Sequence, residues 1–274
     1  MNNLNFLKPV SIKNKMRVGP EYDGGYVVYK PSLYNVDVLM TYGVGWDINF
    51  EVDFYNLTNK TIHMFDPTMF GNQYINKRHC KRLLQRLQFK KLHKYLKYNN
   101  GWKKRIEYLQ ENDVWFHNEG IAVEKKGKYD TFENHLAEYG IVEKRVLLKI
   151  DIEENEYPIL NDSMFYKNLS NIDQIIIEIH NIKNRLRELK TIIQKLKVEY
   201  EIVHIHGNNN SELFTLYNES CDIKFPDVIE LTFVKQKSIL PEDLLNEQIN
   251  YPEKGLDYPN TPYKLDFRQL SFGE

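Results

Sequence analysis

Two short apolar runs, each followed at once by acidic residues or a histidine, constrain the fold of this chain more than any other feature. Leu147–Ile150 leads into Asp151, and the run that begins at Ile175 ends in Glu178 and His180. Runs of this length that are rich in isoleucine and leucine are typical of strands buried on both faces of a parallel sheet. Open parallel sheets bind ligands at the carboxyl ends of their strands. The pattern therefore predicts that these polar side chains lie at the ligand-binding edge of an α/β enzyme.

Strands and helices alternate along the rest of the chain, which predicts a mostly parallel α/β sheet with helices on both faces. Further segments have the composition of strands, namely 36–42, 61–65, 114–117, 201–206 and 228–234. One helix is predicted from an apolar stripe at the helical period, made of Leu186, Leu189, Ile192, Ile193 and Leu196. A shorter helix is predicted over Thr131–Tyr139, with Gly140 placed to end it.

The size and composition of the chain exclude several classes of protein. It has 274 residues, 42% of them hydrophobic, and no internal repeat or low-complexity linker, which favours a single domain over 1–274. Its net charge of -1 gives no basis for binding nucleic acid. No apolar segment approaches the ~20 residues of a membrane span, and the start of the chain has no signal-peptide pattern. With only two cysteines, the chain is predicted to be cytoplasmic.

Two segments differ from the rest in composition. Residues 77–105 are rich in lysine, arginine and leucine, which predicts a basic helical insertion at about 70–110. Such a segment is either a solvated helix packed on the sheet or a cationic wall for a phosphorylated substrate. The tail from about Ser238 is rich in proline, asparagine and tyrosine, and we expect it to form an extended arm that packs on the domain.

A glycine-containing turn follows the first long strand. Gly43 and Gly45 come directly after residues 36–42, and Asp66 closes the next strand about twenty residues later. An acid at this place typically holds the ribose hydroxyls of a nucleotide-like cofactor. The dinucleotide fingerprint is incomplete, because Ile48 stands where its third glycine belongs, and no phosphate-binding P-loop is present. The pattern favours an adenosine-based cofactor without a bridging pyrophosphate.

In order and spacing, a set of short motifs resembles the FkbM-type S-adenosylmethionine-dependent methyltransferases. The motifs span most of the chain and are Arg17–Gly19, Asp23–Val27, Tyr42–Asp47 with Phe50 and Glu51, Phe65–Thr68, Asn118–Ala122, Lys149–Glu153, Ile177–His180, His204–Asn209, Pro226–Glu230 and Asp257–Asn260. The resemblance implies a Rossmann-like, seven-stranded methyltransferase sheet whose last strand is antiparallel. It also implies S-adenosylmethionine as cofactor, S-adenosylhomocysteine as product, and O-methylation of a sugar or similar hydroxyl compound.

Two positions depart from the family pattern. Glu154 stands where a glycine usually follows the acid pair, and Thr41 stands where many methyltransferases have an acid before the first glycine. The first departure concerns the conformation of a turn. The second concerns one contact to the amine of the methionine part of the cofactor.

The resemblance assigns cofactor contacts residue by residue. They fall on Gly43, Val44, Gly45, Asp47, Glu51, Asp66, Pro67 and Asn118. The glycines would let the backbone reach the methionine part, and Asp66 would accept hydrogen bonds from the ribose. Asp47 and Glu51 have the alternative role of capping the following helix, and Asn118 that of satisfying a turn.

Methyl transfer to a hydroxyl needs a group that takes the hydroxyl proton, because a sugar hydroxyl is neutral at pH 7. His180 is the preferred base, oriented by Glu178 or Asp151, and His206 is its competitor because it also ends a strand. A second mechanism uses the same residues: Asp151, Glu178 and His180 would bind a divalent ion that lowers the hydroxyl pKa. The sequence leaves the choice between base and metal open.

The acceptor predicted from the resemblance is a nucleotide-activated sugar such as a heptose, destined for a capsule or another surface glycan. Its contacts are predicted at Arg17, Asp23, Glu153, His204 and Asn208, although Arg17 and Asp23 also fit an ion pair in an N-terminal hairpin. Two rival functions remain: an NAD-dependent sugar-nucleotide dehydrogenase or epimerase, and a non-catalytic binding module. No membrane partner is predicted, and a homo-oligomer remains open.

Overall fold

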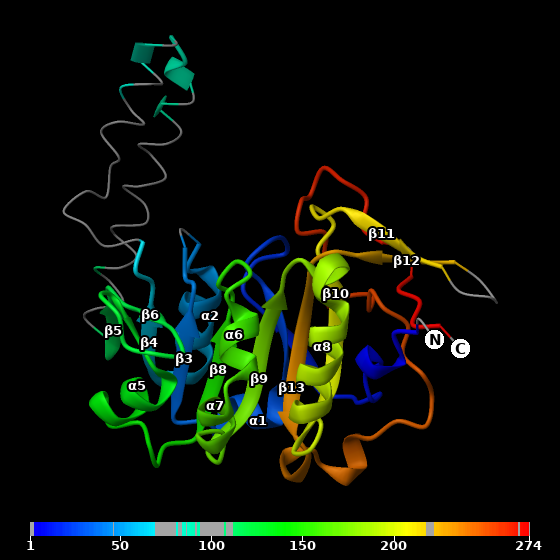
Figure 1. Cartoon of the computed structure of the whole chain (residues 1–274), viewed down its shortest axis with the longest axis horizontal. Helices are drawn as coiled ribbons and strands as arrows, with labels where there is room; N and C mark the ends of the chain where they lie inside the picture. The colour runs from blue at the N-terminus through cyan, green and yellow to red at the C-terminus, as the bar shows by residue number, and fades with distance from the viewer. Residues whose placement is uncertain are drawn as a thin grey trace.

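The computed structural model describes residues 3–45, 47–68, 81, 84–85, 87–90, 92–93, 107, 112–217, 222–267 and 269–273. A seven-stranded sheet forms the centre of the molecule, in the order β10-β13-β9-β8-β3-β4-β5 (Figure 1). Its strands are β3 (Val38–Tyr42), β4 (Thr61–Phe65), β5 (Val114–His117), β8 (Val146–Ile150), β9 (Ile172–Ile179), β10 (Tyr200–Gly207) and β13 (Ile229–Lys235). The last strand, β13, runs antiparallel to both neighbours, whereas β9, β8, β3, β4 and β5 pair in parallel. The predicted fold class is therefore confirmed.

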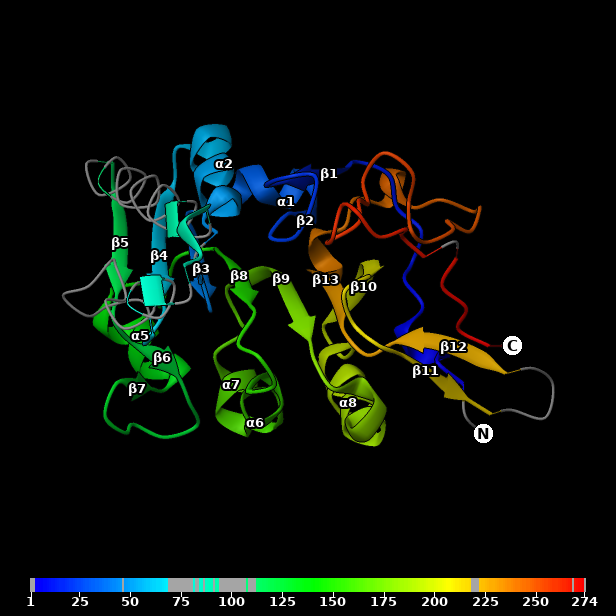
Figure 2. The same cartoon turned by 90° about the horizontal axis from the view of Figure 1, so that it is seen from above.

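Helices cover both faces of this sheet (Figure 2). One face carries α1 (Lys30–Asn35), α2 (Asn49–Thr58) and the hairpin of β1 (Lys15–Val18) and β2 (Tyr26–Tyr29). The other face carries α5 (Phe132–Glu138), α6 (Glu156–Asn161), α7 (Ser163–Lys167) and α8 (Ile182–Leu196). No helix in the described residues has the length and apolar character that crossing a membrane requires.

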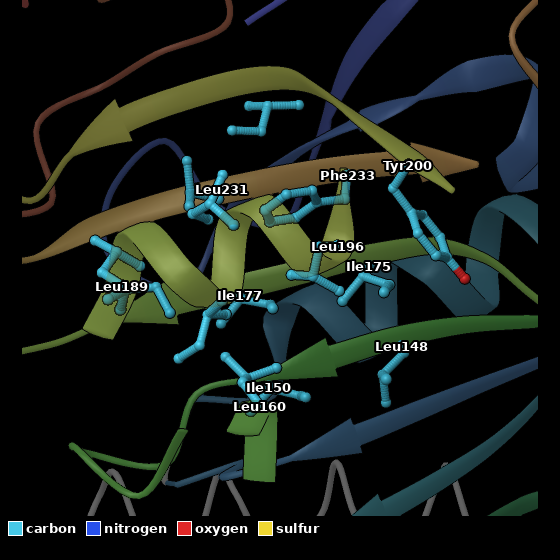
Figure 3. Packing of buried hydrophobic residues seen from close by; sticks show 14 of the residues in the cluster. Leu148, Ile150, Leu160, Ile175, Ile177, Leu189, Leu196, Tyr200, Leu231 and Phe233 are labelled. Atoms are coloured by element: carbon cyan, nitrogen blue, oxygen red, sulfur yellow. The ribbon is translucent and has the colours of Figure 1, made fainter. Parts of the chain in front are cut away.

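The larger apolar core lies between the sheet and α8 (Figure 3). All residues of β8, β9 and β13 are buried, which explains why their sequences are nearly continuous apolar runs. From the helix, Leu189 and Leu196 meet Ile177 and Phe233 of the sheet. Each such side chain contributes roughly 1.5–3 kcal/mol when fully buried. This packing holds the strand ends in fixed positions.

The parallel register brings three strand ends to one edge of the sheet. Tyr42 of β3 pairs with Ile150 of β8, which in turn pairs with Ile177 of β9. Because the strands run in the same direction, the residues that follow them emerge side by side. On the other side of β9, Glu178 lies opposite Glu230 of the antiparallel strand β13. The predicted meeting of polar side chains at the strand ends is thus present.

Smaller elements complete the fold. They are β6 (Gly120–Ile121) with β7 (Tyr129–Asp130), β11 (Leu213–Leu216) with β12 (Ile223–Pro226), and the short 3-10 helices η1 (Asn5–Leu7), η2 (Gln236–Ser238) and η3 (Pro241–Asp243). After β13 the chain continues as an arm beside the β10 end of the sheet (Figure 1). Leu245 N donates to Ser11 O at 2.9 Å, and Leu270 N to Tyr251 O at 2.7 Å, so the arm is bonded to the domain and to itself. The predicted basic insertion lies almost entirely outside the described residues.

Three histidines gather around Phe65 at the β4–β5 side of the sheet. Nδ1 of His63 lies 2.9 Å from Nε2 of His117, and the Tyr42 hydroxyl lies 3.0 Å from Nδ1 of His135. Burial lowers the pKa of His63 to about 4, of His117 to about 3 and of His135 to about 4. These histidines are therefore neutral in the folded protein at pH 7.

This cluster predicts a loss of stability in mild acid. Unfolding returns each histidine to a pKa near 6.5, so the unfolded chain binds more protons and the free energy of unfolding falls as pH drops from about 6.5 towards 4. The loss approaches about 1.4 kcal/mol per pH unit for each histidine that titrates. Urea denaturation between pH 7.5 and 4.5 measures it. His117→Phe keeps an aromatic ring at this position but removes its titration. We expect the free energy of unfolding of this variant to fall less steeply with pH than that of the wild type. Equal slopes would contradict the conclusion that His117 is neutral in the folded protein.

Candidate active site

A cavity of about 970 Å³ lies at the carboxyl ends of β3, β4 and β8. Among the residues predicted for the site, its walls include Asp23, Gly43, Val44, Gly45, Asp47, Asp66, Pro67, Asp151 and Glu153. Apolar side chains, including Phe65 and Ile121, line another part of it. The cavity thus joins the glycine turn after β3 to the acids after β8.

The glycine turn and Asp66 form one bonded unit. Gly45 N donates to Oδ2 of Asp66 at 2.9 Å, while Oδ1 of Asp66 accepts from the backbone and hydroxyl of Thr68 at 2.8 and 2.7 Å. Gly43 has a φ of +77°, and a Cβ there would stand 1.5 Å from the backbone oxygen of Asp151. The close approach of β3 to β8 therefore requires glycine at this position.

Three predicted cofactor contacts have other partners. Oδ1 of Asp47 accepts from Asn49 N at 2.9 Å at the start of α2, although Asp47 also lines the cavity. Glu51 is fully buried, accepts from the Thr41 hydroxyl at 2.9 Å and does not line the cavity. Asn118 accepts from Nζ of Lys128 at 2.9 Å and is likewise absent from the cavity wall.

Asp151 and Glu178 face each other across the phenol of Tyr26. The Tyr26 hydroxyl lies 3.0 Å from Oδ2 of Asp151 and 3.3 Å from Oε2 of Glu178. Asn208 adds a hydrogen bond from Nδ2 to Oε1 of Glu178 at 3.1 Å. Of these two acids, only Asp151 lines the cavity, and Glu178 lies behind it.

His180 stands next to these acids, but its orienting partner is not the one predicted. Nδ1 of His180 lies 2.8 Å from Oε1 of Glu156, the first residue of α6, which is fully buried. Its Nε2 faces Oε1 of Glu178 and Oε2 of Glu153, both at 3.6 Å. Glu156 therefore replaces Glu178 and Asp151 as the group that fixes the imidazole.

The acid–base properties of this group are shifted from their ordinary values. Burial raises the pKa of Asp151 to about 6. Burial and the nearby Asp151 raise the pKa of Glu178 well above its usual range. Burial lowers the pKa of His180, but its hydrogen bond to Glu156 and the surrounding carboxylates outweigh this effect and raise it overall. Shifts of this kind are common where proton transfer occurs.

Some predicted residues are outside the cavity wall and have their partners elsewhere in the protein. His206 is fully buried between Asp266 and Glu230, with Nε2 3.2 Å from the first and Nδ1 3.4 Å from the second. Burial lowers its pKa, but these carboxylates raise it to about 10. A histidine that is charged at neutral pH and enclosed by protein is unsuited to act as a base, so His206 is not the competitor that its position at a strand end predicted.

His204 and Arg17 hold the C-terminal arm rather than the cavity. Nε2 of His204 lies 2.7 Å from Oδ1 of Asp257. Arg17 donates to the backbone oxygens of Pro20, Tyr22 and Leu256 at 2.7, 2.9 and 3.2 Å. Neither residue lines the cavity: His204 is bonded to the arm, and Arg17 is bonded to the arm and to the turn between β1 and β2.

Two residues near the site, Asn260 and Glu230, belong to motifs of the family resemblance, but the sequence assigned them no role. Nδ2 of Asn260, in the arm, donates to Oε1 of Glu230 at 2.6 Å and to Oδ1 of Asp23 at 3.2 Å. Glu230 is in addition an acid inside the apolar run of β13. Their placement depends on the antiparallel pairing of β13 and on the path of the arm, which local patterns do not reveal.

The turn after β8 accommodates Glu154 in place of the usual glycine. Glu153 and Glu154 have φ values of 53° and 74°, in the left-handed region that favours glycine. Nδ2 of Asn155 donates to the oxygens of Ile152 and Glu153 at 3.1 and 3.4 Å, and Oε2 of Glu154 accepts from Asn181 at 2.9 Å. The turn keeps its shape through these bonds.

Comparisons with known proteins give little guidance. No family model matches the chain, and no curated protein matches it either. Among solved structures, the chain is similar to an rRNA methylase from Streptococcus thermophilus, with 12% identity and a TM-score of 0.35. The match covers 74% of this chain and 92% of that one. A likeness at this level carries no information about the activity of this chain.

Proposed function

We propose that the protein is an S-adenosylmethionine-dependent O-methyltransferase that acts on a sugar hydroxyl. The observation that carries the proposal is the continuity of one cavity, which joins the glycine turn and Asp66 to Asp151 and the acid–base group behind it. A methyltransferase of this kind needs both parts within reach of each other, because cofactor and acceptor must meet in line.

The glycine turn and Asp66 supply the cofactor half. Asp66 is buried and has its carboxylate fixed by Gly45 and Thr68, and the lone pair of Oδ2 that these bonds leave free can accept from a ribose hydroxyl. The left-handed turn at Gly43 and Gly45 leaves backbone open towards the cavity for the methionine part. Phe65 and Ile121 offer an apolar surface for the adenine.

The group of Asp151, Glu178 and His180 supplies the acceptor half. The acceptor oxygen attacks the methyl carbon, a C–O bond forms, and the C–S bond breaks with its electron pair passing to sulfur. S-adenosylhomocysteine leaves as the product. The hydroxyl proton must leave the oxygen during attack, and the carboxylate of Glu153, which lines the cavity beside this group, can receive it. Because the sulfonium is a good leaving group, the protein mainly positions the reactants and takes up the proton.

The acceptor class follows from the polar groups beside Asp151. Asp23 and Glu153 line the cavity with hydrogen-bond acceptors, which suits a compound with several hydroxyl groups. Combined with the resemblance to FkbM-type enzymes, this favours a nucleotide-activated sugar such as a heptose, used for a capsule or another surface glycan.

Transfer of a labelled methyl group tests the proposal. We expect label from S-adenosylmethionine to appear on a nucleotide-activated heptose, and we expect Asp66→Asn to raise KM for the cofactor by about tenfold or more, since one charged hydrogen bond is worth roughly 1.5–3 kcal/mol. Asp222→Asn is the matched control, because Asp222 is exposed and absent from the cavity wall. Equal KM values for the two variants would contradict the role of Asp66.

A further inference from the structure

The carboxylates of Asp151, which is partly buried, and Glu178, which is buried, lie together, and within the described residues no basic side chain is hydrogen-bonded to either. Glu178 is 5% exposed, and its partners are the neutral groups of Tyr26 and Asn208. Asp151 accepts from Tyr26 alone. In the described part of the chain, no lysine or arginine donates a hydrogen bond to these two acids. Buried carboxylates are normally paired with a cation or bound to a metal ion, and here the nearby basic groups, Lys149 and His180, act on the pair without a hydrogen bond to it.

The spacing of the nearby polar atoms suits an ion better than direct hydrogen bonds. One ligand atom each from Asp151, Glu178 and His180 can be chosen so that all lie within 4.8 Å of one another. Nε2 of His180 is 3.6 Å from Oε1 of Glu178, which is too long for a hydrogen bond. Two ligands bound at about 2.1 Å to one ion stand roughly 3–4.2 Å apart. Small side-chain rotations bring the three atoms to such distances.

His180 is held in the way that metal-binding histidines are held. Its Nδ1 lies 2.8 Å from the buried carboxylate of Glu156, which fixes the ring and leaves Nε2 directed at Glu178. A carboxylate that holds the far ring nitrogen is a regular partner of histidine ligands, since it sets both tautomer and orientation. The contact with Glu156 is independent of Asp151 and Glu178, and it points to a ligand on Nε2.

We propose that Asp151, Glu178 and Nε2 of His180 bind one divalent ion, Mg²⁺ or Mn²⁺, at the inner end of the cavity. Two carboxylate oxygens and one imidazole nitrogen form a set dominated by oxygen, which these hard ions prefer. Asp151 lines the cavity, so the open positions of the ion face the space where the acceptor binds. The three protein ligands leave room for two hydroxyl oxygens of a sugar.

The role of this ion rests on the proposed function. A sugar hydroxyl that binds a divalent ion loses its proton more readily, because the ion stabilises the negative oxygen. The proton passes to the carboxylate of Glu153 and from there to water. Glu153 lines the cavity, its carboxylate is 3.6 Å from Nε2 of His180, and its side chain is 86% exposed. The oxygen then attacks the methyl carbon, and the sulfur keeps the electron pair of the broken bond. The ion therefore selects acceptors with neighbouring hydroxyls.

Electron paramagnetic resonance with Mn²⁺ tests the site on the purified full chain without cofactor. We expect one Mn²⁺ per chain, displaced by Mg²⁺, and we expect Asp151→Asn to weaken binding by more than tenfold. Glu156→Gln is expected to weaken binding by about 10- to 100-fold, because it loosens the histidine. No saturable binding of Mn²⁺ by the wild type, or unchanged binding by Asp151→Asn, would overturn the site.

Asp23→Asn is the matched control. Asp23 belongs to a second acidic group, with Glu178 and Glu230, and it is expected to keep Mn²⁺ affinity within about threefold of wild type. A loss in Asp23→Asn with none in Asp151→Asn would place the ion elsewhere and refute the assignment. The Mn²⁺ titration needs neither cofactor nor acceptor, so the two proposals fail separately. If Mn²⁺ binds but no methyl group is transferred, only the proposed function is contradicted. If the cofactor binds but Mn²⁺ does not, only the ion site is contradicted.

Discussion

Gly43→Ala is expected to lower the free energy of unfolding by at least about 4 kcal/mol, a size reached only by severe packing or backbone conflicts. A Cβ at Gly43 would stand 1.5 Å from the backbone oxygen of Asp151 and 2.6 Å from its carbonyl carbon. Both atoms belong to the main chain, so a side-chain rotation cannot relieve the overlap. The ends of β3 and β8 must separate, which breaks the 3.0 Å bond from Asp151 N to Tyr42 O. Urea denaturation measures the loss.

Gly45→Ala is the control for this prediction. Gly45 also has a positive φ, 59°, but a Cβ there meets no atom within 4 Å. Only the cost of a left-handed alanine remains, about 1–2 kcal/mol. The difference between the two variants therefore measures the cost of the overlap with β8, apart from the cost of the left-handed backbone conformation. Similar losses in both would show that the approach of Gly43 to Asp151 is not what requires glycine.

Asp151→Asn is expected to lower the rate of methyl transfer by about 10³-fold while the folded protein loses no stability. Proton transfer by a placed group contributes roughly 10²–10⁴ to a rate, and the substitution removes the charge without changing the shape. The asparagine oxygen still accepts from Tyr26, and one negative charge leaves a group in which Asp151 and Glu178 repel each other. Turnover and thermal unfolding of the metal-free protein measure these two consequences.

Asp173→Asn is expected to give the opposite result. Asp173 is buried, but Nε of Arg145 donates to it at 2.7 Å, so its charge is paired. Removing that charge costs about 1 kcal/mol, since Arg145 is partly exposed, and turnover stays unchanged. If Asp151→Asn lowered the free energy of unfolding by more than about 1 kcal/mol and kept its turnover, Asp151 would stabilise the fold and take no part in methyl transfer.

The sheet was predictable from the sequence because each strand is a separate apolar run with its own boundaries. Residues 61–65 and 114–117 were predicted as strands with the ends that they have in the structure. The antiparallel direction of the last strand came from resemblance to a family, and the order of strands was not predicted, since no local pattern specifies which strands pair. Topology depends on how helices cover both faces, and that is a property of the whole chain.

Site residues were predictable where they follow a strand directly. Gly43, Gly45, Asp66 and Asp151 line one cavity because parallel strands end at the same edge. The partner of His180 was missed, because Glu156 approaches from the first turn of α6 and not from a strand end. His206 was misjudged because its enclosure depends on the carboxylate of Asp266, which lies sixty residues away in the arm. Long-range side-chain pairs of this kind leave no periodic trace.

The most direct test of the account is a calorimetric titration of the purified protein with S-adenosylhomocysteine, with NAD⁺ as the control ligand. We expect saturable binding of S-adenosylhomocysteine at one site per chain and no binding of NAD⁺, because the glycine turn and Asp66 suit an adenosine cofactor without a pyrophosphate. Tight binding of NAD⁺ instead, or no heat with S-adenosylhomocysteine at millimolar concentration, would contradict the proposal that this cavity serves methyl transfer.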